Sequence, residues 1–282
     1  MYTTANTKLL GVFGYPIGHT LSPKLHSILA EKTNADVTYL AFLVSPEELG
    51  KKFNAAKELG AVGLNITVPH KIHIMEHLDV IDPMAERIGA VNTVVKKDDL
   101  WYGYNTDGLG FLKSLSLNNI NFQGENILML GAGGSARAVA YALAEHGAKS
   151  LTITARTQEK ADSIGALIEE YTDCKYFSVP DYDKKYDIII NTTPLGMAPL
   201  ENENPFDRYD IVSDSTVCCD LIYSPWETLF LKDAKSQGAK TINGLGMLVF
   251  QGIYAFSHFT GKSFDDNLFK ETYELFSEEF RK

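Results

Sequence analysis

A glycine-rich loop after a short apolar run constrains the fold of this chain more than any other part of its sequence. Residues 127–130 are all apolar and lead into Gly131-Ala132-Gly133-Gly134-Ser135-Ala136, and a helical pattern follows as far as His146. Strand, glycine turn and helix in this order are the context in which such a loop binds a dinucleotide. Gly131 permits the tight turn, Gly133 lets the backbone approach a pyrophosphate, and Ala136 allows close packing of the helix. The free N–H groups of the first helical turn suit phosphate oxygens.

The region after this loop alternates between strand and helix patterns. Its apolar or β-branched runs are at 150–155, 175–179, 187–190, 217–222 and 240–242. Helical patterns at 158–171 and 228–238 lie between them. Such alternation predicts a parallel sheet with helices on both faces, which is a Rossmann-type doubly wound sheet.

The residues after the second strand of this region indicate which nucleotide is bound. NAD-binding versions of the fold usually place Asp or Glu there, which accepts a hydrogen bond from the ribose 2′-hydroxyl. This chain has Ala155-Arg156-Thr157, followed by Lys160 one turn later. An arginine suits a 2′-phosphate, so NADP is favoured over NAD. The alternative is that both cations are only solvated surface residues.

Length and charge narrow the class of protein further. With 282 residues the chain is longer than a single core usually needs, and we expect two domains. Its formal net charge of −10 argues against nucleic acid or an anionic membrane as a partner. It has neither a signal-peptide pattern nor an apolar run long enough to cross a bilayer. Its three cysteines lack the CxxC spacing, and together these features predict a reducing, cytoplasmic location.

The N-terminal half contains a turn-rich loop, residues 14–23, that leads into a predicted helix. Ser22 followed by Pro23 indicates an N-cap with proline at the first helical position, and the helix should run to about Glu31. The hydroxyls of Thr20 and Ser22 would then lie at a helix N-terminus, where a carboxylate can bind. Ser22 could equally be no more than the cap of its helix.

Two ionisable residues stand at predicted helix starts. We expect Pro69 to start a helix, which would place Lys71 in the first turn beside the positive end of the dipole and ease proton exchange. Asp107 lies where a strand gives way to a helix, which is also a common place for a purely structural acid. No metal is expected: HIMEH at 73–77 matches a zinc-peptidase pattern, but no acidic ligand cluster follows it.

Eight segments in the same order resemble the shikimate dehydrogenase family over nearly the full length of the chain. They are GYPIGHTLSP at 14–23, NITVPHK at 65–71, GAVNT at 89–93, GYNTDG at 103–108, GAGGSAR at 131–137, NTTPLGM at 191–197, DLIYSPWET at 220–228 and GLGMLVFQG at 244–252. The resemblance implies an α/β protein with a substrate-binding catalytic domain, residues 1–107 and 243–282. It also implies a Rossmann domain for NADP, residues 108–242, with C-terminal helices that return to the first domain and substrate in the intervening cleft.

The resemblance also implies an activity and its residues. The activity is the reversible, NADP-linked reduction of 3-dehydroshikimate to shikimate, in the biosynthesis of chorismate and the aromatic amino acids. Lys71 and Asp107 correspond to the catalytic pair. The positions that correspond to substrate-binding residues are Thr20, Ser22, Asn65, Thr67, Asn92, Tyr223 and Gln251. The positions on the cofactor side are Gly131, Gly133, Gly134, Ser135, Ala136, Arg156, Thr157, Lys160, Thr192 and Met247.

Three positions depart from the family pattern. Thr20 replaces the usual serine and adds a methyl group beside the substrate carboxylate, Ala155 replaces an asparagine, and Asn243 replaces an aspartate. Thr20 and Ala155 leave open a quinate or dual quinate/shikimate dehydrogenase that uses NAD or NADP. A more remote alternative is a catalytically silent paralogue that senses metabolites. The sequence leaves open whether the chain forms a homodimer.

Overall fold

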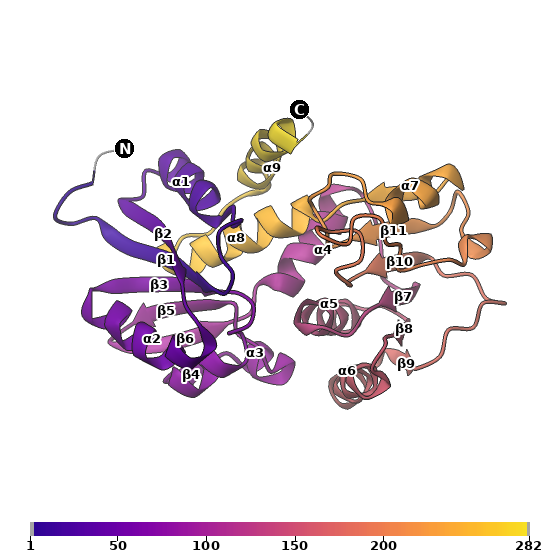
Figure 1. The fold of residues 1–282 in the computed structure, drawn as a ribbon, viewed down its shortest axis with the longest axis horizontal. Coiled ribbons are helices and arrows are strands. Elements are labelled where there is room, and N and C mark those ends of the chain that lie inside the picture. Colours follow the sequence, from indigo (N-terminus) through magenta and orange to yellow (C-terminus); the bar gives the residue numbers. More distant parts are fainter. Residues whose placement is uncertain (1–2, 281–282) are drawn as a thin grey trace. The chain divides into compact units, whose positions relative to one another are not determined.

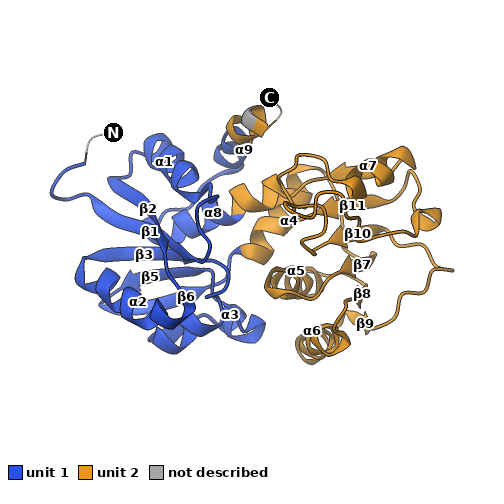
Figure 2. Ribbon diagram, in the orientation of Figure 1, with its two compact units in different colours: residues 1–106, 251–272 blue, residues 107–250, 273–282 orange. Residues whose placement is uncertain are grey.

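The computed structural model describes residues 3–280, apart from the side chain of Glu279. The chain divides into two compact units, each described here by itself (Figures 1 and 2). Unit 1 comprises Met1–Thr106 and Gln251–Thr272, and unit 2 comprises Asp107–Phe250 and Tyr273–Lys282. The predicted division into 1–107 with 243–282 and 108–242 differs from this one at Asp107 and at both ends of the C-terminal segment, and it stays a prediction.

Unit 1 is built on a mixed six-stranded sheet in the order β2-β1-β3-β5-β6-β4 (Figure 1). Strand β1 pairs in parallel with β2 and β3, whereas β5 pairs antiparallel with β3 and β6. The strand bounds are β1 Lys8–Gly14, β2 Val37–Leu43, β3 Ala61–Ile66, β4 Val80–Ile81, β5 Thr93–Lys97 and β6 Leu100–Tyr104. The helices of its N-terminal part are α1 Ser22–Thr33, η1 Pro46–Glu48, α2 Leu49–Glu58, η2 His73–His77 and α3 Pro83–Ile88.

Unit 2 is built on a fully parallel six-stranded sheet in the order β12-β11-β10-β7-β8-β9. The strands are β7 Asn126–Leu130, β8 Ser150–Thr154, β9 Lys175–Phe177, β10 Ile188–Asn191, β11 Val217–Asp220 and β12 Lys240–Ile242. From the centre of the sheet, β7, β8 and β9 follow one another towards one edge, and β10, β11 and β12 follow one another towards the other edge. This is the doubly wound Rossmann order, so the predicted fold class is confirmed.

The core of unit 2 shows why these strands form a sheet that is buried on both faces. Successive residues of a strand point to opposite faces. Ile127 and Met129 pack in a cluster with apolar residues of α4 (Asp107–Leu117), α5 (Gly134–Glu145) and α6 (Gln158–Tyr171). Leu128 and Leu130 pack on the other face with residues of α7 (Leu229–Ser236). The continuous apolar run of β7 is therefore the pattern expected of a central parallel strand.

Two helices complete the C-terminal part of the chain, α8 (Leu245–Thr260) and α9 (Asp266–Phe280). Helix α8 begins in unit 2 and ends in unit 1, and α9 begins in unit 1. The predicted return of the C-terminal helices to the first domain is thus confirmed for residues 251–272. Among the described residues, none of the helices combines the length and apolar character that a bilayer span requires.

Local structure differs from two sequence-based expectations in unit 1. The helix predicted to start at Pro69 is wrong, because residues 68–72 form turns and only the short 3-10 helix η2 follows them. Lys71 therefore does not occupy the first turn of an α-helix, and the dipole argument for it fails. Ser22 is also not the N-cap of α1: the cap residue is Leu21, and it makes no side-chain cap hydrogen bond.

Candidate functional site

In unit 2, Gly131 occupies a turn that only glycine fits. Its φ of 108° lies in the left-handed region. A Cβ atom added there would lie 2.6 Å from Thr192 Oγ1. The N–H of Gly131 donates to the Thr154 carbonyl at 2.8 Å. The protein itself therefore requires a glycine at the end of β7.

Gly133 and Gly134 lack a side chain for a different reason. A Cβ atom at either position would meet no other atom of the protein within 4 Å. Helix α5 begins at Gly134 without a side-chain cap, so the N–H groups of its first turn, including that of Ser135, face outward for an acceptor. Open space and free N–H groups at one helix start fit the phosphates of a dinucleotide. Ala136 next to them is fully buried, which brings α5 close to the sheet.

Thr192 follows β10, on the opposite side of the point where the strand order reverses. Its N–H and its hydroxyl both donate to the Leu130 carbonyl at 2.8 Å, so the hydroxyl oxygen is left as an acceptor. Ligands of doubly wound sheets bind at this switch point. Met247, near the start of α8, is 9% exposed and packs in the apolar cluster of this unit that contains Phe111 and Leu115.

Three exposed residues follow β8. Arg156 and Lys160 make no ion pair within residues 3–280, although their neighbours include acidic side chains. Thr157 is the N-cap of α6 and makes no cap hydrogen bond with its side chain. Two unpaired cations beside an uncapped helix start can hold an anionic group such as a 2′-phosphate.

In unit 1, a buried hydrogen-bond network surrounds Asn65 at the end of β3. The Tyr39 hydroxyl donates to Asn65 Oδ1 at 2.8 Å. Asn65 Nδ2 donates to the backbone carbonyl of Asn92 at 3.1 Å and to Thr93 Oγ1 at 3.2 Å. All four residues are buried, so each polar atom in the group depends on these partners.

Asn92 continues the network towards the end of β6. Its Oδ1 accepts from the Thr106 N–H at 2.9 Å and from Thr93 Oγ1 at 2.9 Å. Its Nδ2 donates to Thr106 Oγ1 at 3.0 Å and lies 3.5 Å from Gln251 Oε1. The structure therefore brings together Asn65, Asn92 and Gln251, which are far apart in the sequence.

The predicted carboxylate-binding hydroxyls form a local pair before α1. Thr20 Oγ1 donates to Ser22 Oγ at 3.2 Å, and the Ser22 N–H donates back to Thr20 Oγ1 at 3.3 Å. Both residues are half-buried. Thr67 is also half-buried, and its N–H donates to the Phe13 carbonyl at 3.0 Å, which fixes the turn after β3.

The two predicted catalytic residues belong to different units. Lys71 in unit 1 is half-buried, and its carbonyl accepts from the Val91 N–H at 2.8 Å. Asp107 begins α4 in unit 2 and is buried, and it follows Thr106 of the Asn92 network directly in the chain. Tyr223 also belongs to unit 2, where it is half-buried with its ring 6.0 Å from that of Phe280.

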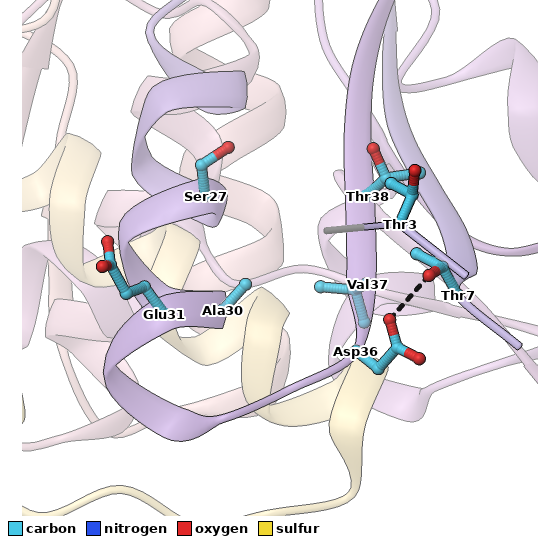
Figure 3. Close-up of a pocket in the computed structure, with 8 residues that line it drawn as sticks. All are labelled: Thr3, Thr7, Ser27, Ala30, Glu31, Asp36, Val37 and Thr38. Carbon is cyan, nitrogen blue, oxygen red and sulfur yellow. Dashed lines mark hydrogen bonds between the residues drawn. The ribbon is translucent and has the colours of Figure 1, made fainter. Parts of the chain in front are cut away.

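A separate surface hollow in unit 1 contains none of these residues (Figure 3). It lies between the second half of α1, the start of β2 and the segment before β1, and its Asp36 carboxylate is already the acceptor of the Thr7 hydroxyl at 2.7 Å. Within residues 3–280, no group of three His, Cys, Asp or Glu residues could hold a metal ion. His73 and His77 are exposed on η2.

Tyr39, Thr93 and Thr106 contribute to the network although no sequence pattern marked them as site residues. Tyr39 looks like an ordinary strand residue of β2, since tyrosine is common in strands. Thr93 and Thr106 stand inside the GAVNT and GYNTDG segments, and their position beside Asn92 and Asp107 is the one signal that could have suggested them.

Comparisons with known proteins identify the family. Residues 12–94, within unit 1, match the model described as the shikimate dehydrogenase substrate binding domain. Residues 114–217, within unit 2, match the one described as shikimate / quinate 5-dehydrogenase. A shikimate dehydrogenase (NADP(+)) from Bacillus cereus (strain B4264) is 45% identical over 260 residues, which cover 91% of this chain and 94% of that protein. The chain belongs to the shikimate dehydrogenase family.

Solved structures of shikimate dehydrogenases share the whole fold. One is the enzyme from Listeria monocytogenes in complex with shikimate and NAD, with a TM-score of 0.89, 33% identity and coverage of 96% of this chain and 98% of that one. Another is a shikimate dehydrogenase in complex with NADP+, with a TM-score of 0.87, 41% identity and coverage of 96% of each chain. The predicted membership of the shikimate dehydrogenase family is confirmed.

Proposed function

We propose that this chain is an NADP-dependent shikimate dehydrogenase, an oxidoreductase that reversibly reduces 3-dehydroshikimate to shikimate in the biosynthesis of chorismate and the aromatic amino acids. The observation that carries the proposal is the buried amide network of unit 1. Asn65 and Asn92 are buried polar side chains and Gln251 beside them is half-buried, an arrangement that suits a small polyhydroxy ligand. The hydroxyls of Thr20 and Ser22 supply donors for its carboxylate, and Thr67 supplies a further hydroxyl.

The cofactor proposal depends on unit 2. The free N–H groups of Gly134, Ser135 and Ala136 bind the pyrophosphate, where Gly131 and Gly133 let the chain come close. Arg156, Thr157 and Lys160 bind the 2′-phosphate, and Thr192 and Met247 complete the nicotinamide side. The relatives named as NADP(+)-dependent and the neighbour that binds NADP+ support this choice.

Bound NADP supplies hydride chemistry to the reaction. The chain itself must manage the proton. When the substrate carbonyl is reduced, its oxygen gains negative charge and needs a proton, and Lys71 Nζ gives that proton and stabilises the charge. In the reverse direction Lys71 takes the proton from the substrate hydroxyl. Asp107 orients both the ammonium group and the substrate hydroxyl.

A steady-state assay tests the proposal. Purified protein is given shikimate or quinate with NADP+ or NAD+, and the formation of reduced cofactor is followed for the four combinations. We expect shikimate with NADP+ to have the highest kcat/KM. A preference for quinate would instead support the dual or quinate-specific enzyme, for which the extra methyl group of Thr20 is the motivating observation. A preference for NAD+ would remove the role of Arg156. Binding without turnover would support the metabolite sensor.

The proposal includes a cytoplasmic location and a small-molecule substrate, with neither nucleic acid nor membrane as a partner. Cys174, Cys218 and Cys219 are all free and buried thiols, which suits a reducing compartment. Fractionation of cells that express a tagged chain tests the location. A homodimer also stays a prediction, and sedimentation velocity of the purified chain would decide it.

A further inference from the structure

We propose that Tyr39 and Thr93 are positioning residues that fix which hydrogen-bonding atoms Asn65 and Asn92 present to the substrate. The inference rests on the proposed function and adds two residues to it. Neither side chain need touch the substrate. Each holds one of the amides through a buried hydrogen bond that ties together β2, β3 and β5 of unit 1.

The orientation of the Asn65 amide is determined by the backbone. A backbone carbonyl can only accept a hydrogen bond, so the atom of Asn65 that faces the Asn92 carbonyl must be Nδ2. The other atom, Oδ1, then faces Tyr39, whose hydroxyl must be the donor. Both protons of Nδ2 are used, on the Asn92 carbonyl and on Thr93 Oγ1. Asn65 therefore presents Oδ1 as its acceptor, and the Tyr39 hydroxyl and the neighbouring His26 imidazole share this side chain.

The orientation of Asn92 is determined in the same way, with the opposite result. A backbone N–H can only donate, so the atom that faces the Thr106 N–H must be Oδ1. Thr93 Oγ1 accepts from Asn65 and gives its own proton to Asn92 Oδ1. The Thr93 hydroxyl, the Thr106 N–H and the Thr106 hydroxyl all donate to the oxygen of Asn92. Its Nδ2 is the donor side of the amide and faces Thr106 Oγ1 at 3.0 Å and Gln251 Oε1 at 3.5 Å. The two amides are thus fixed in opposite senses, and a substrate hydroxyl would engage the oxygen of Asn65 or the nitrogen of Asn92 in place of a present partner.

The Tyr39 ring is held firmly enough for its hydroxyl to act as a fixed donor. It stacks on the His26 imidazole with 4.1 Å between ring centroids and 7° between planes. Phe256 and Phe259 of α8 contact the same imidazole, each with a centroid distance of 5.7 Å. His26 Nδ1 is buried without a hydrogen-bond partner, and burial lowers the pKa of His26 to about 3, against a hydrogen bond with the Asn65 side chain that acts in the opposite direction. The imidazole therefore stays neutral, stacks on Tyr39 and also lies beside the Asn65 side chain.

The Tyr39 phenol also keeps its proton. Burial raises its pKa well above the usual value, with the nearby Ser22 hydroxyl acting in the opposite direction. The position of Ser22 beside this phenol links the carboxylate-binding hydroxyls to the amides that hold the ring hydroxyls.

The first test replaces Tyr39 by Phe, which removes the hydroxyl and keeps the stacked ring. We expect KM for shikimate to rise roughly tenfold, the value of one lost neutral hydrogen bond at the upper end. KM for NADP+ should stay within about twofold and kcat should fall less than KM rises. Tyr186→Phe is the matched control, because Tyr186 in unit 2 is equally buried at 5% exposed and its hydroxyl accepts from the Asp181 N–H. The control should leave KM for shikimate unchanged.

A double-mutant cycle separates positioning from a general loss of stability. If Tyr39 acts through Asn65, then Tyr39→Phe should have no further effect on KM for shikimate in an Asn65→Ala background. Thr93→Val provides an independent variant should Tyr39→Phe fail to fold. It should raise KM for shikimate, and Thr93→Ser, which restores the hydroxyl, should rescue it.

The outcomes distinguish this inference from the proposed function. An active wild-type enzyme whose KM for shikimate changes less than twofold in Tyr39→Phe, or in Thr93→Val if the first variant does not fold, would overturn the positioning role alone. An equal rise in KM for NADP+, an equal effect of Tyr186→Phe, or full additivity with Asn65→Ala would do the same. A wild-type protein that neither binds nor oxidises shikimate would overturn both.

Discussion

The candidate sites of the two units differ in whether backbone groups or side chains form them. In unit 2, the candidate cofactor site consists mostly of backbone: a glycine required by its φ of 108°, two glycines with open space beside them, and the free N–H groups at the start of α5. In unit 1, the candidate substrate site consists of side chains. Its amides are oriented by hydrogen bonds between residues that are 14, 26, 27 and 28 positions apart. The backbone site depends on conformation and the side-chain site on a complete network.

The largest effect should come from removing the side chain of Lys71, the proposed proton donor. Lys71→Ala removes the proposed proton donor and should lower kcat by roughly a thousandfold, within the range for general acid–base catalysis. KM for shikimate should change only a few-fold, since Lys71 contributes chiefly in the transition state. Steady-state kinetics at saturating NADP+ measure both values. Near-normal turnover in this variant would rule out Lys71 as the proton donor.

Unit 2 also contains a buried side-chain network, which is centred on Asp220. The Asp220 carboxylate accepts from Asn191 Nδ2 at 3.1 Å, from the Ile222 N–H at 2.9 Å and from Thr228 Oγ1 at 2.7 Å. It thereby ties the loop after β11 to the loop that bears Thr192. Burial raises the pKa of this carboxyl to about 6, against the effect of its hydrogen bonds.

A raised pKa in the folded state means that folding favours the protonated form of Asp220. Its contribution to stability is therefore full below about pH 4, the unfolded value, and is lost as the pH rises through about 6. The loss is at most about 3 kcal/mol, from a pKa difference of roughly two. Asp220→Asn, which stays neutral, should lack this part of the pH dependence. Urea unfolding across this range measures it, and parallel curves for the two proteins would contradict the assignment.

A smaller effect concerns the side chains at the edge of the backbone site. Arg156→Gln should raise KM for NADP+ by roughly 30-fold, the value of a hydrogen bond to a charged group. KM for NAD+ should hardly change, because NAD lacks the 2′-phosphate. Kinetics with both cofactors give the ratio directly. An equal rise in KM for both cofactors would mean that Arg156 stabilises the loop and does not bind the 2′-phosphate.

The smallest effect tests whether Gly131 is needed by the fold and Gly133 by the cofactor. Gly133→Ala should leave Tm nearly unchanged and raise KM for NADP+ roughly tenfold, because the new methyl group meets only the cofactor. Gly131→Ala should lower Tm by several degrees, because alanine is strained at this φ and its Cβ would meet Thr192. Thermal unfolding without cofactor separates the two. A lower Tm in Gly133→Ala would show that its glycine is needed by the fold.

The same contrast explains how far each unit could be predicted. The Rossmann sheet follows from local signals, since its apolar strands, its glycine turn and its alternating helices are contiguous in sequence, and the structure confirms it. The mixed sheet of unit 1 carries weaker signals, and the segment after β3 was predicted wrongly as a helix from Pro69. A proline at a turn and at a helix start look alike when the hydrogen-bond partners, such as Val91 for the Lys71 carbonyl, lie elsewhere in the chain.

The side-chain network explains the remaining difference. Asn65 and Asn92 could be named from their segments through the family resemblance, but their partners could not. Tyr39 and His26 have patterns of ordinary buried residues, and only the fold places the phenol 2.8 Å from Asn65 Oδ1. Ser22 shows that a local pattern can also mislead. A serine before a proline predicts a helix cap, but the cap residue is Leu21 and the Ser22 N–H donates to Thr20 Oγ1.

The proposed function requires that the amide network bind shikimate and that the same protein then oxidise it. The most direct measurement is shikimate titrated into one preparation by calorimetry, with NADPH formation followed in that preparation after NADP+ is added. We expect saturable shikimate binding and sustained NADPH production that both disappear in a Gln251→Ala, Asn92→Ala double variant. Binding of shikimate without any NADPH, or NADPH production that survives the loss of both amides, would contradict it.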